Sequence, residues 1–391
     1  MISFRRDRFT WLAYFMLGYY AYLQSAVGPL MLFLRSELDL SYTAGGLHVS
    51  TFAAGMIVAG LFTDRLAGRW GRRWTFWGGA AGMAAGAILL TLGRQVVMTV
   101  AGTFIMGLFG GALLVTIQAG LSDRHGERRA IALTESNVMA AVCAALAPLC
   151  IGGLEQAGLG WRAALWLMVV LGGLLAAGFW RTPIPAARRL TGAPFRAGGH
   201  GRLPPTFWAY WLVIVLCVAV EWCLAFWAAD FLAGVAGLPK SAASTAVSAF
   251  FVAMIAGRVI GSRLARSIPS GKLLVGAVGV AAVGFPLFWL SRLPALNVAG
   301  LFVVGLGVAN LFPLGMATAT GVAASMADTA SARVSMGAGL AILTAPLLLG
   351  RVADLIGIQD AFGLVVVLLI LAGGVALWAL RFSARQAPAV I

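Results

Sequence analysis

The chain has 391 residues, of which 61% are apolar and only 10% are charged, and its mean hydropathy is +0.94. A soluble domain is typically about 45 to 50% apolar and about 25% charged, so this composition excludes an ordinary soluble protein and indicates a membrane protein. The net charge is +15. It does not indicate a nucleic-acid-binding protein, because the basic residues are spread over many polar segments instead of forming one patch.

Twelve apolar runs follow one another along the chain, and a membrane-spanning helix needs roughly 20 such residues. The first run begins directly after a basic N-terminal segment and continues past the length of a signal peptide, so we expect a retained helix. The runs cover about residues 9–34, 43–63, 74–93, 96–121, 130–154, 161–180, 207–232, 241–262, 273–291, 295–321, 332–353 and 361–380. The sequence therefore predicts an all-α integral membrane protein with twelve transmembrane helices.

A cluster of charges lies between the second and third runs, in the stretch GLFTDRLAGRWGRRW. It carries one acid and four arginines: Asp64, Arg65, Arg69, Arg72 and Arg73. If both termini are cytoplasmic, this cluster and most other Arg and Lys residues fall on the cytoplasmic side, as the positive-inside rule requires. We therefore expect a plasma-membrane protein, in bacteria an inner-membrane protein, with both termini in the cytoplasm.

Polar residues within the apolar runs are candidates for function, because polar groups at membrane depth normally face protein or water. In the first run, Tyr20 and Gln24 lie one helical turn apart on one face. Glu135 lies about 9 Å inside the fifth run, and Arg258 lies about 12 Å inside the eighth.

Glu221, in CVAVEWCLAFWAADF, lies about 21 Å along the seventh run, near or slightly beyond its middle. A charge at that depth costs about 3 kcal/mol on insertion scales. No arginine is near it in sequence, so desolvation favours the neutral acid. A proton-coupling group, a contact for a cationic solute and a protonated structural hydrogen-bonder all stay open for Glu221. Trp222 and Asn310 are further cavity candidates, although Asn310 could equally satisfy backbone groups freed near Pro313.

One long polar gap divides the runs six and six. It is rich in Pro, Gly and Arg, and it predicts an N-terminal six-helix bundle at 1–180, a cytoplasmic linker at 181–206, and a C-terminal six-helix bundle with a short tail at 207–391. An internal repeat supports two halves in parallel order, because a shift of 198 residues places DRLAGR on SRLARS and APLCIG on APLLLG (262 − 64 and 345 − 147 both equal 198). Folds of this kind bind solute near the bilayer midplane, between the halves.

The stretch GLFTDRLAGRWGRR resembles the signature loop between the second and third helices of the major facilitator superfamily. The matching positions are Gly60, Asp64, Arg65, Gly71, Arg72 and Arg73. The twelve runs and the central linker also fit this family, so the resemblance covers essentially the whole chain. It implies two pseudo-symmetric six-helix bundles whose first, fourth, seventh and tenth helices line a cavity. The cavity candidates are then Tyr20, Gln24, Glu221, Trp222 and Asn310.

The resemblance also implies a cytoplasmic gate made of charge pairs between the halves. In the family the second helix packs against the eleventh, so Asp64 would pair with Arg333, at the start of the eleventh run. The fifth helix packs against the eighth, so Glu135 would pair with Arg258. Two alternatives stay open: the cluster at 60–74 could serve only to anchor its loop, and Glu135 could bind solute or take part in proton coupling.

The resemblance implies a secondary transporter of a small organic solute, working by alternating access between the two halves, and Glu221 leads us to expect that transport is proton-coupled. An uncoupled uniporter is the alternative within transport. A membrane enzyme or an ion channel is less expected, because neither a catalytic cluster nor a filter sequence is visible. The expected partners are a small-molecule substrate, protons and the lipid bilayer, with no nucleic acid, and the protein is expected to act as a monomer. The four cysteines lie in apolar runs without metal-ligand spacing, so no metal and no cofactor is expected.

Overall fold

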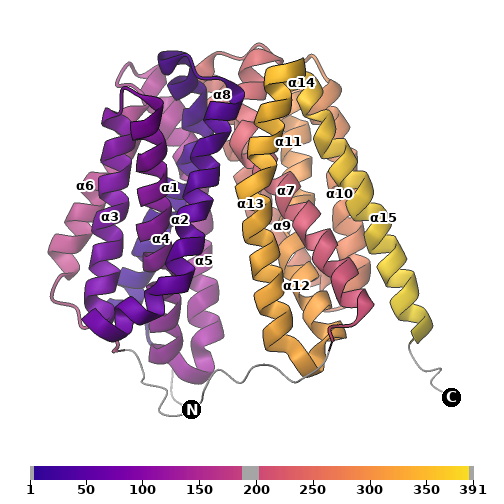
Figure 1. The fold of residues 1–391 in the computed structure, drawn as a ribbon, viewed down its shortest axis with the longest axis horizontal. Helices are drawn as coiled ribbons and strands as arrows, with labels where there is room; N and C mark the ends of the chain where they lie inside the picture. Colours follow the sequence, from indigo (N-terminus) through magenta and orange to yellow (C-terminus); the bar gives the residue numbers. More distant parts are fainter. Residues whose placement is uncertain (1–3, 187–201, 387–391) are drawn as a thin grey trace. The chain divides into compact units, whose positions relative to one another are not determined.

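The computed structural model describes residues 4–186 and 202–386, and in this part of the chain the secondary structure is helical, with no strand. Long helices are joined by short turns (Figure 1). The helices are α1 (Arg8–Leu38), α2 (Tyr42–Trp70), α3 (Arg72–Leu92), α4 (Val96–His125), α5 (Arg129–Gln156), α6 (Arg162–Phe179), α7 (Pro205–Gly234), α8 (Lys240–Ala246), α9 (Ser248–Leu264), α10 (Ser270–Leu290), α11 (Pro294–Val308), α12 (Leu311–Val322), α13 (Ala327–Ile356), α14 (Ile358–Ala361) and α15 (Gly363–Gln386), with 3-10 turns at Gly126–Arg128 and Ala324–Met326. The predicted all-α membrane protein is confirmed.

Ten segments of the described residues are long and apolar enough to cross a membrane. One of them, Val96–Gln156, contains both α4 and α5. Helix α1 has 31 residues and lies outside the ten, because its tyrosines and Gln24 make it less apolar than its neighbours. Each of the twelve predicted runs coincides with one helix or with a run of two, such as α8 and α9 or α11 and α12.

The chain forms two compact units. Unit 1 holds the described residues of Met1–Thr191 and of Pro239–Ser248, and unit 2 holds those of Gly192–Leu238 and of Ala249–Ile391. In unit 1, α4 packs against α2 and α3, and α1 packs against α5. In unit 2, α7 packs against α12, α13 and α15, and α10 packs against α11.

The first part of the predicted eighth run groups with unit 1. Helix α8 packs against α5 there, and a Cβ built on Gly152 would lie 2.3 Å from the carbonyl oxygen of Ser241. The predicted division into residues 1–180, 181–206 and 207–391 stays a prediction. Within it, residues 187–201 of the linker and 387–391 of the tail lie outside the described part of the chain.

The ends of the first helices follow from local chemistry. Asp7 caps α1 by accepting a hydrogen bond from the backbone N–H of Thr10, and Ser41 caps α2 in the same way. Gly71, the only residue between α2 and α3, has φ of +87°, a conformation that side chains disfavour. The glycine of the signature loop therefore permits the tight turn that directs Arg72 and Arg73 into the first turn of α3.

Close backbone contact fixes α2 against α4 in unit 1. A Cβ built on Gly107 would lie 2.0 Å from the carbonyl oxygen of Phe52, so any larger residue would push the two helices apart. Unit 2 has a comparable contact between α10 and α11, where a Cβ built on Gly300 would lie 2.2 Å from the backbone nitrogen of Phe288. It also has an aromatic cluster, in which the rings of Phe231, Phe285, Phe288 and Phe362 contact one another with centroids 4.6 to 6.4 Å apart.

Candidate functional site

A partly exposed polar position lies in the middle of α1. From Met16 to Leu34, every residue of α1 is buried except Gln24 and Ser25. The Ser25 hydroxyl is near two carbonyl oxygens, at 3.2 Å from Tyr22 and 3.1 Å from Ala144, and can donate to either. Gln24 is therefore the polar group that unit 1 presents at mid-span on this helix.

Gln24 belongs to a small polar cluster with Tyr20 and Met56, which we call the Gln24 cluster. The Gln24 amide nitrogen lies 3.1 Å from the Tyr20 hydroxyl oxygen and 3.6 Å from the Met56 sulfur. The Tyr20 hydroxyl donates to the same sulfur over 3.4 Å. The structure thus places the predicted pair Tyr20 and Gln24 together, and it adds Met56 of α2, which the sequence analysis missed.

In unit 2 the corresponding position lies on α7. From Cys217 to Leu232, only Glu221, Trp222 and Ala225 are partly exposed, and all the other residues are buried. Glu221 is therefore partly exposed although most of the helix around it is buried. This is the exposure expected of a mid-span polar group that meets water or solute.

Arg258 of α9 is exposed, and its positive charge acts on the Glu221 carboxyl within unit 2. Sequence reasoning did not reveal this, because the two residues lie on different helices. Asn310 lies at the break between α11 and α12, where Pro313 cannot donate a backbone hydrogen bond. Its side-chain nitrogen donates to the Gly257 carbonyl oxygen over 2.6 Å. Asn310 therefore ties α9 to this break, and its predicted contact with solute stays a prediction.

Glu135 is bound within unit 1 by residues of α1 and the segment before it. Arg6 donates to both carboxylate oxygens, with nitrogen–oxygen distances of 2.8 and 2.6 Å, and the Tyr14 hydroxyl donates to one of them over 2.9 Å. A paired hydrogen bond of this kind is among the strongest that arginine makes. The predicted pair of Glu135 with Arg258 stays a prediction.

A second ion pair joins the start of α1 to the end of α4. Asp7 accepts from Arg124 over 2.6 Å, and it also accepts from the backbone and hydroxyl of Thr10. Burial alone would raise the pKa of Asp7, but the Thr10 hydrogen bonds and the Arg124 charge outweigh it, so this pKa lies below its usual value. Asp7 and Arg124 line a cavity of about 370 Å³ together with Arg8, Thr182 and Pro185.

The signature loop is tied to unit 1 by its arginines. The Arg72 side chain, 7% exposed, forms an ion pair with Asp123 at 2.7 Å and donates to the carbonyl oxygens of Pro185 and Ala186 at 3.0 and 3.3 Å. Arg73 donates to the carbonyl oxygens of Trp180 and Thr182, just after α6. These two arginines therefore anchor the chain that leaves α6.

The other predicted gate residues are exposed or make few contacts within their own units. Asp64 and Arg333 are both exposed. Arg65 lies over the Phe62 ring at 5.9 Å, and a Cβ on Gly60 would meet nothing within 4 Å. Gly60 is thus not required for packing in unit 1, and the pair of Asp64 with Arg333 stays a prediction.

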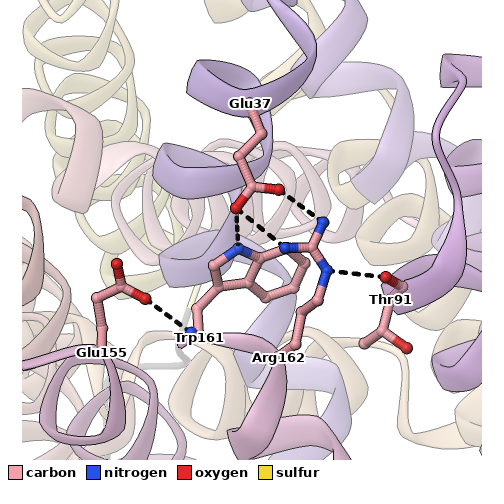
Figure 2. A network of polar contacts seen from close by, with 5 residues as sticks. All are labelled: Glu37, Thr91, Glu155, Trp161 and Arg162. Atoms are coloured by element: carbon pink, nitrogen blue, oxygen red, sulfur yellow. Dashed lines mark hydrogen bonds and ion pairs between the residues drawn. The ribbon is translucent and has the colours of Figure 1, made fainter. Parts of the chain in front are cut away.

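A network of polar contacts joins helices at the end of unit 1 opposite the signature loop. We call it the five-residue clasp, and it consists of Glu37, Thr91, Glu155, Trp161 and Arg162 (Figure 2). Glu37 accepts two hydrogen bonds from the Arg162 guanidinium and one from the Trp161 indole, over 2.6 to 3.0 Å. Arg162 also donates to the Thr91 carbonyl oxygen, and Glu155 accepts from the Trp161 backbone. The clasp joins the ends of α1, α3 and α5 to the start of α6.

Sequence reasoning missed four residues that hold the candidate site residues: Arg6, Tyr14, Met56 and Asp123. Arg6 and Asp123 carried only a partial signal: each is a charge at a predicted helix end on the same side as the residue it binds, but nothing in the sequence selects its partner. Tyr14 and Met56 carried none, because an aromatic or thioether side chain in an apolar run is ordinary core material. Among the described residues, no group of three or more His, Cys, Asp or Glu residues could hold a metal ion.

Comparison with known proteins places this architecture among transporters. The sequence profile of the Major Facilitator Superfamily matches residues 10–320. An uncharacterized MFS-type transporter of Yersinia pestis is 26% identical over 365 residues, which are 88% of this chain and 89% of that protein. The multidrug resistance protein MdtL of Escherichia coli is 31% identical over 141 residues, 35% of this chain and 36% of MdtL.

Solved structures show the same fold at low identity. A bacterial homolog of the human lysosomal transporter Spinster, in an inward-facing and unoccupied conformation, matches with a TM-score of 0.76 and 16% identity, over 98% of this chain and 99% of that one. The nucleoside transporter NupG matches with a TM-score of 0.75 and 14% identity, over 97% and 100% of the two chains. At these identities the likeness concerns the fold alone.

Proposed function

Since the chain belongs to the major facilitator superfamily, we propose that it is a secondary transporter that moves a small organic solute by alternating access and couples the movement to protons. The observation that carries the proposal is the matching exposure in the two units. Each presents a polar side chain in the middle of a buried helix, Gln24 in α1 and Glu221 in α7. Folds with repeated halves place their solute at this depth.

The relatives support an organic solute. MdtL is named as a multidrug resistance protein, and NupG as a nucleoside transporter. We extend neither substrate to this chain, but both are organic molecules handled by the same fold. Trp222, partly exposed beside Glu221, offers an aromatic face to such a molecule, and it could contact a cation or a planar ring.

Glu221 is the residue that we propose to carry the coupled proton. It is an acid at mid-span, partly exposed on a helix whose neighbouring positions are mostly buried. The hydration of such a carboxyl changes when the cavity opens or closes, and its tendency to hold a proton changes with hydration. Arg258 lies on α9 of the same unit and is exposed, so we propose that its interactions also change with the charge of Glu221.

We further propose that Arg258 then takes Glu135 from Arg6 when the cytoplasmic side closes. Arg6 and Arg258 are both exposed, so neither has to leave a buried site to exchange. The second gate pair would join Asp64 to Arg333, both exposed as well. Paired charges of this kind can stabilise one state of a two-state transporter and be broken in the other.

The test of coupling uses Glu221→Gln in proteoliposomes, with unmodified protein as the control. Gln keeps the size and hydrogen-bonding groups of the protonated acid but cannot release a proton. We expect the variant to exchange solute across equal concentrations and to lose accumulation driven by a pH difference, because only net transport moves a proton. Continued accumulation by Glu221→Gln at unchanged affinity would remove Glu221 from both coupling and solute binding.

The test of the gate uses double-mutant cycles built from Glu135→Gln, Arg258→Gln and Arg6→Gln. The measured quantity is the fraction of molecules open to the cytoplasm, followed by the distance between labels on the cytoplasmic ends of α5 and α9. We expect Glu135→Gln and Arg258→Gln to be non-additive and each to raise that fraction, and Arg6→Gln alone to lower it. Additive effects of the first two variants would contradict the exchange.

The setting of this activity is proposed from the charge distribution. Both termini are cytoplasmic in the proposal, and the membrane is the bacterial inner membrane, as the positive-inside pattern and the bacterial relatives favour. The protein would act as a monomer, with protons and a small solute as its partners and no nucleic acid.

A further inference from the structure

The Gln24 cluster carries information about the solute. We propose that the side-chain carbonyl oxygen of Gln24 accepts a hydrogen bond from the solute, and that the solute is an amine that bears at least one N–H. This inference rests on the proposed transport function and adds the chemical class of the substrate to it. It follows from which of the three side chains donate a hydrogen bond and which accept one.

The Met56 sulfur fixes the direction of the cluster. A thioether has no proton, so it can only accept. The Tyr20 hydroxyl, 3.4 Å from that sulfur, therefore donates to it, and its oxygen is left as an acceptor for the Gln24 amide nitrogen at 3.1 Å. A flipped amide would place the Gln24 oxygen 3.6 Å from the sulfur, where two acceptors face each other without a proton.

The two amide protons of Gln24 are thereby used within the protein. One is directed to the Tyr20 oxygen and the other to the Met56 sulfur. The amide oxygen makes no hydrogen bond with any residue that the structure describes, and Gln24 is partly exposed. A polar atom at membrane depth without a partner is costly, so this oxygen requires water or a ligand that can donate.

The amide is held in this orientation by packing on three helices. Tyr20 is only 4% exposed, and a Cβ on Gly110 of α4 would lie 3.2 Å from its ring. Tyr20 and Gln24 come from α1 and Met56 comes from α2. The acceptor is thus pre-organised, which lowers the cost of ordering it when a solute binds.

Both mid-span groups then favour a donor. Gln24 offers an acceptor from unit 1, and Glu221, when ionised, offers an acceptor with a negative charge from unit 2. A protonated primary, secondary or tertiary amine suits each of these groups taken by itself, since it has a positive charge and an N–H. A quaternary ammonium ion has the charge without the donor.

The experiment measures binding of three phenethylamine cations to the purified protein: phenethylamine, its N,N-dimethyl derivative and its N,N,N-trimethyl derivative. They carry three, one and no N–H, while their size grows with each methyl group. We expect the affinity of the unmodified protein to fall about tenfold between the dimethyl and trimethyl cations, the step that removes the last donor.

Three variants test whether the Gln24 cluster causes the fall in affinity between the dimethyl and trimethyl cations. Gln24→Leu should abolish this fall in affinity, whereas Gln24→Glu, which keeps an acceptor, should retain it. Met56→Leu is nearly isosteric and should reduce it, because the freed Tyr20 hydroxyl can then donate to the Gln24 oxygen and occupy it. The melting temperature of each variant without ligand shows whether it is folded, and the Met56→Leu result decides if Gln24→Leu does not fold.

The inference is overturned if none of the three cations binds, if the affinity falls smoothly with size, or if Gln24→Leu or Met56→Leu keeps the full step. Transport is measured separately, as flux of phenethylamine into proteoliposomes. A donor-dependent step without flux would overturn the proposed transport function and leave the binding inference standing. If the trimethyl cation is transported at the same rate and with the same affinity as phenethylamine, the binding inference is overturned and the proposed transport function stands.

Discussion

The two units can be compared by the bonds described at their helix contacts. Ion pairs that join helix ends in unit 1 include Arg6 with Glu135, Arg72 with Asp123, Arg124 with Asp7, and Arg162 with Glu37. In unit 2 the described bonds between helices include three from tryptophan indoles to backbone carbonyl oxygens: Trp211 to Arg333, Trp227 to Pro346 and Trp289 to Gln359. Ion pairs respond to salt and to pH, whereas bonds between two neutral groups hardly do.

This difference separates structural roles from functional ones. In unit 1 the described ion pairs lie toward the ends of the helices, and the mid-span group is a neutral amide. In unit 2 an acid lies at mid-span, and the three indole bonds named above are neutral. A change in the protonation of Glu221 is therefore not expected to weaken those three bonds directly. We expect a change in salt concentration to act mainly on the ion pairs of unit 1.

The largest effect should come from Arg72→Ala. Arg72 is buried, and its loss leaves Asp123 without its partner and two carbonyl oxygens without a donor. Removing one partner of a buried ion pair typically costs 3 to 5 kcal/mol, and Asp123 is 27% exposed, so we expect about 3 kcal/mol of unfolding free energy. Thermal unfolding in detergent measures the loss. Asp123→Asn is the matched control, and a stability for Arg72→Ala equal to that of the unmodified protein would refute the anchoring role.

A smaller effect should come from Arg162→Ala in the five-residue clasp. The Arg162 and Glu37 side chains are 32% and 39% exposed, so water screens their charges, and we expect a loss of about 1 to 2 kcal/mol. The loss should shrink as the salt concentration rises, because part of it is an interaction between charges. Unfolding measured at low and at high salt tests both points.

The smallest effect should come from Trp289→Phe in unit 2. This variant removes one indole bond of 2.7 Å from a partly exposed side chain, so we expect a loss of about 1 kcal/mol. Unlike the loss for Arg162→Ala, it should not change with salt, and the same unfolding series serves for both variants. If the two losses depend equally on salt, the contrast between the units is wrong.

The sequence predicted the helices well because each leaves a local signal. The apolar runs matched the helices, and the capping residues Asp7 and Ser41 and the turn residue Gly71 stand where α1, α2 and α3 begin. Apolar runs, capping residues and glycine turns each depend on residues that are close together in the sequence. The same reasoning placed Tyr20 and Gln24 on one face, because a spacing of four residues fixes that in any helix.

The partners of the charges could not be predicted in the same way. Arg72 had two acids within reach in the sequence pattern, Asp64 and Asp123, and only packing of α3 on α4 selects Asp123. Glu135 is held by Arg6, which lies outside the helices and so had no face or depth to compare. The effect of Arg258 on Glu221 depends on the arrangement of two helices that are not consecutive, and the periodicity of a sequence does not contain that arrangement.

Arg72 and Arg73 donate hydrogen bonds to the backbone just after α6, and this has a consequence for protein engineering. Helix α6 ends at Phe179, but the carbonyl oxygens of Trp180, Thr182, Pro185 and Ala186 are all bound by these two arginines. Residues 180–186 thus belong to the folded body of unit 1. A truncation, protease site or fusion partner introduced at Arg181 would separate the acceptors of Thr182, Pro185 and Ala186 from the two guanidinium groups. One introduced after Ala186 would leave these bonds of unit 1 in place, and two polypeptides divided there are the better starting point for reassembling the protein from separately expressed halves.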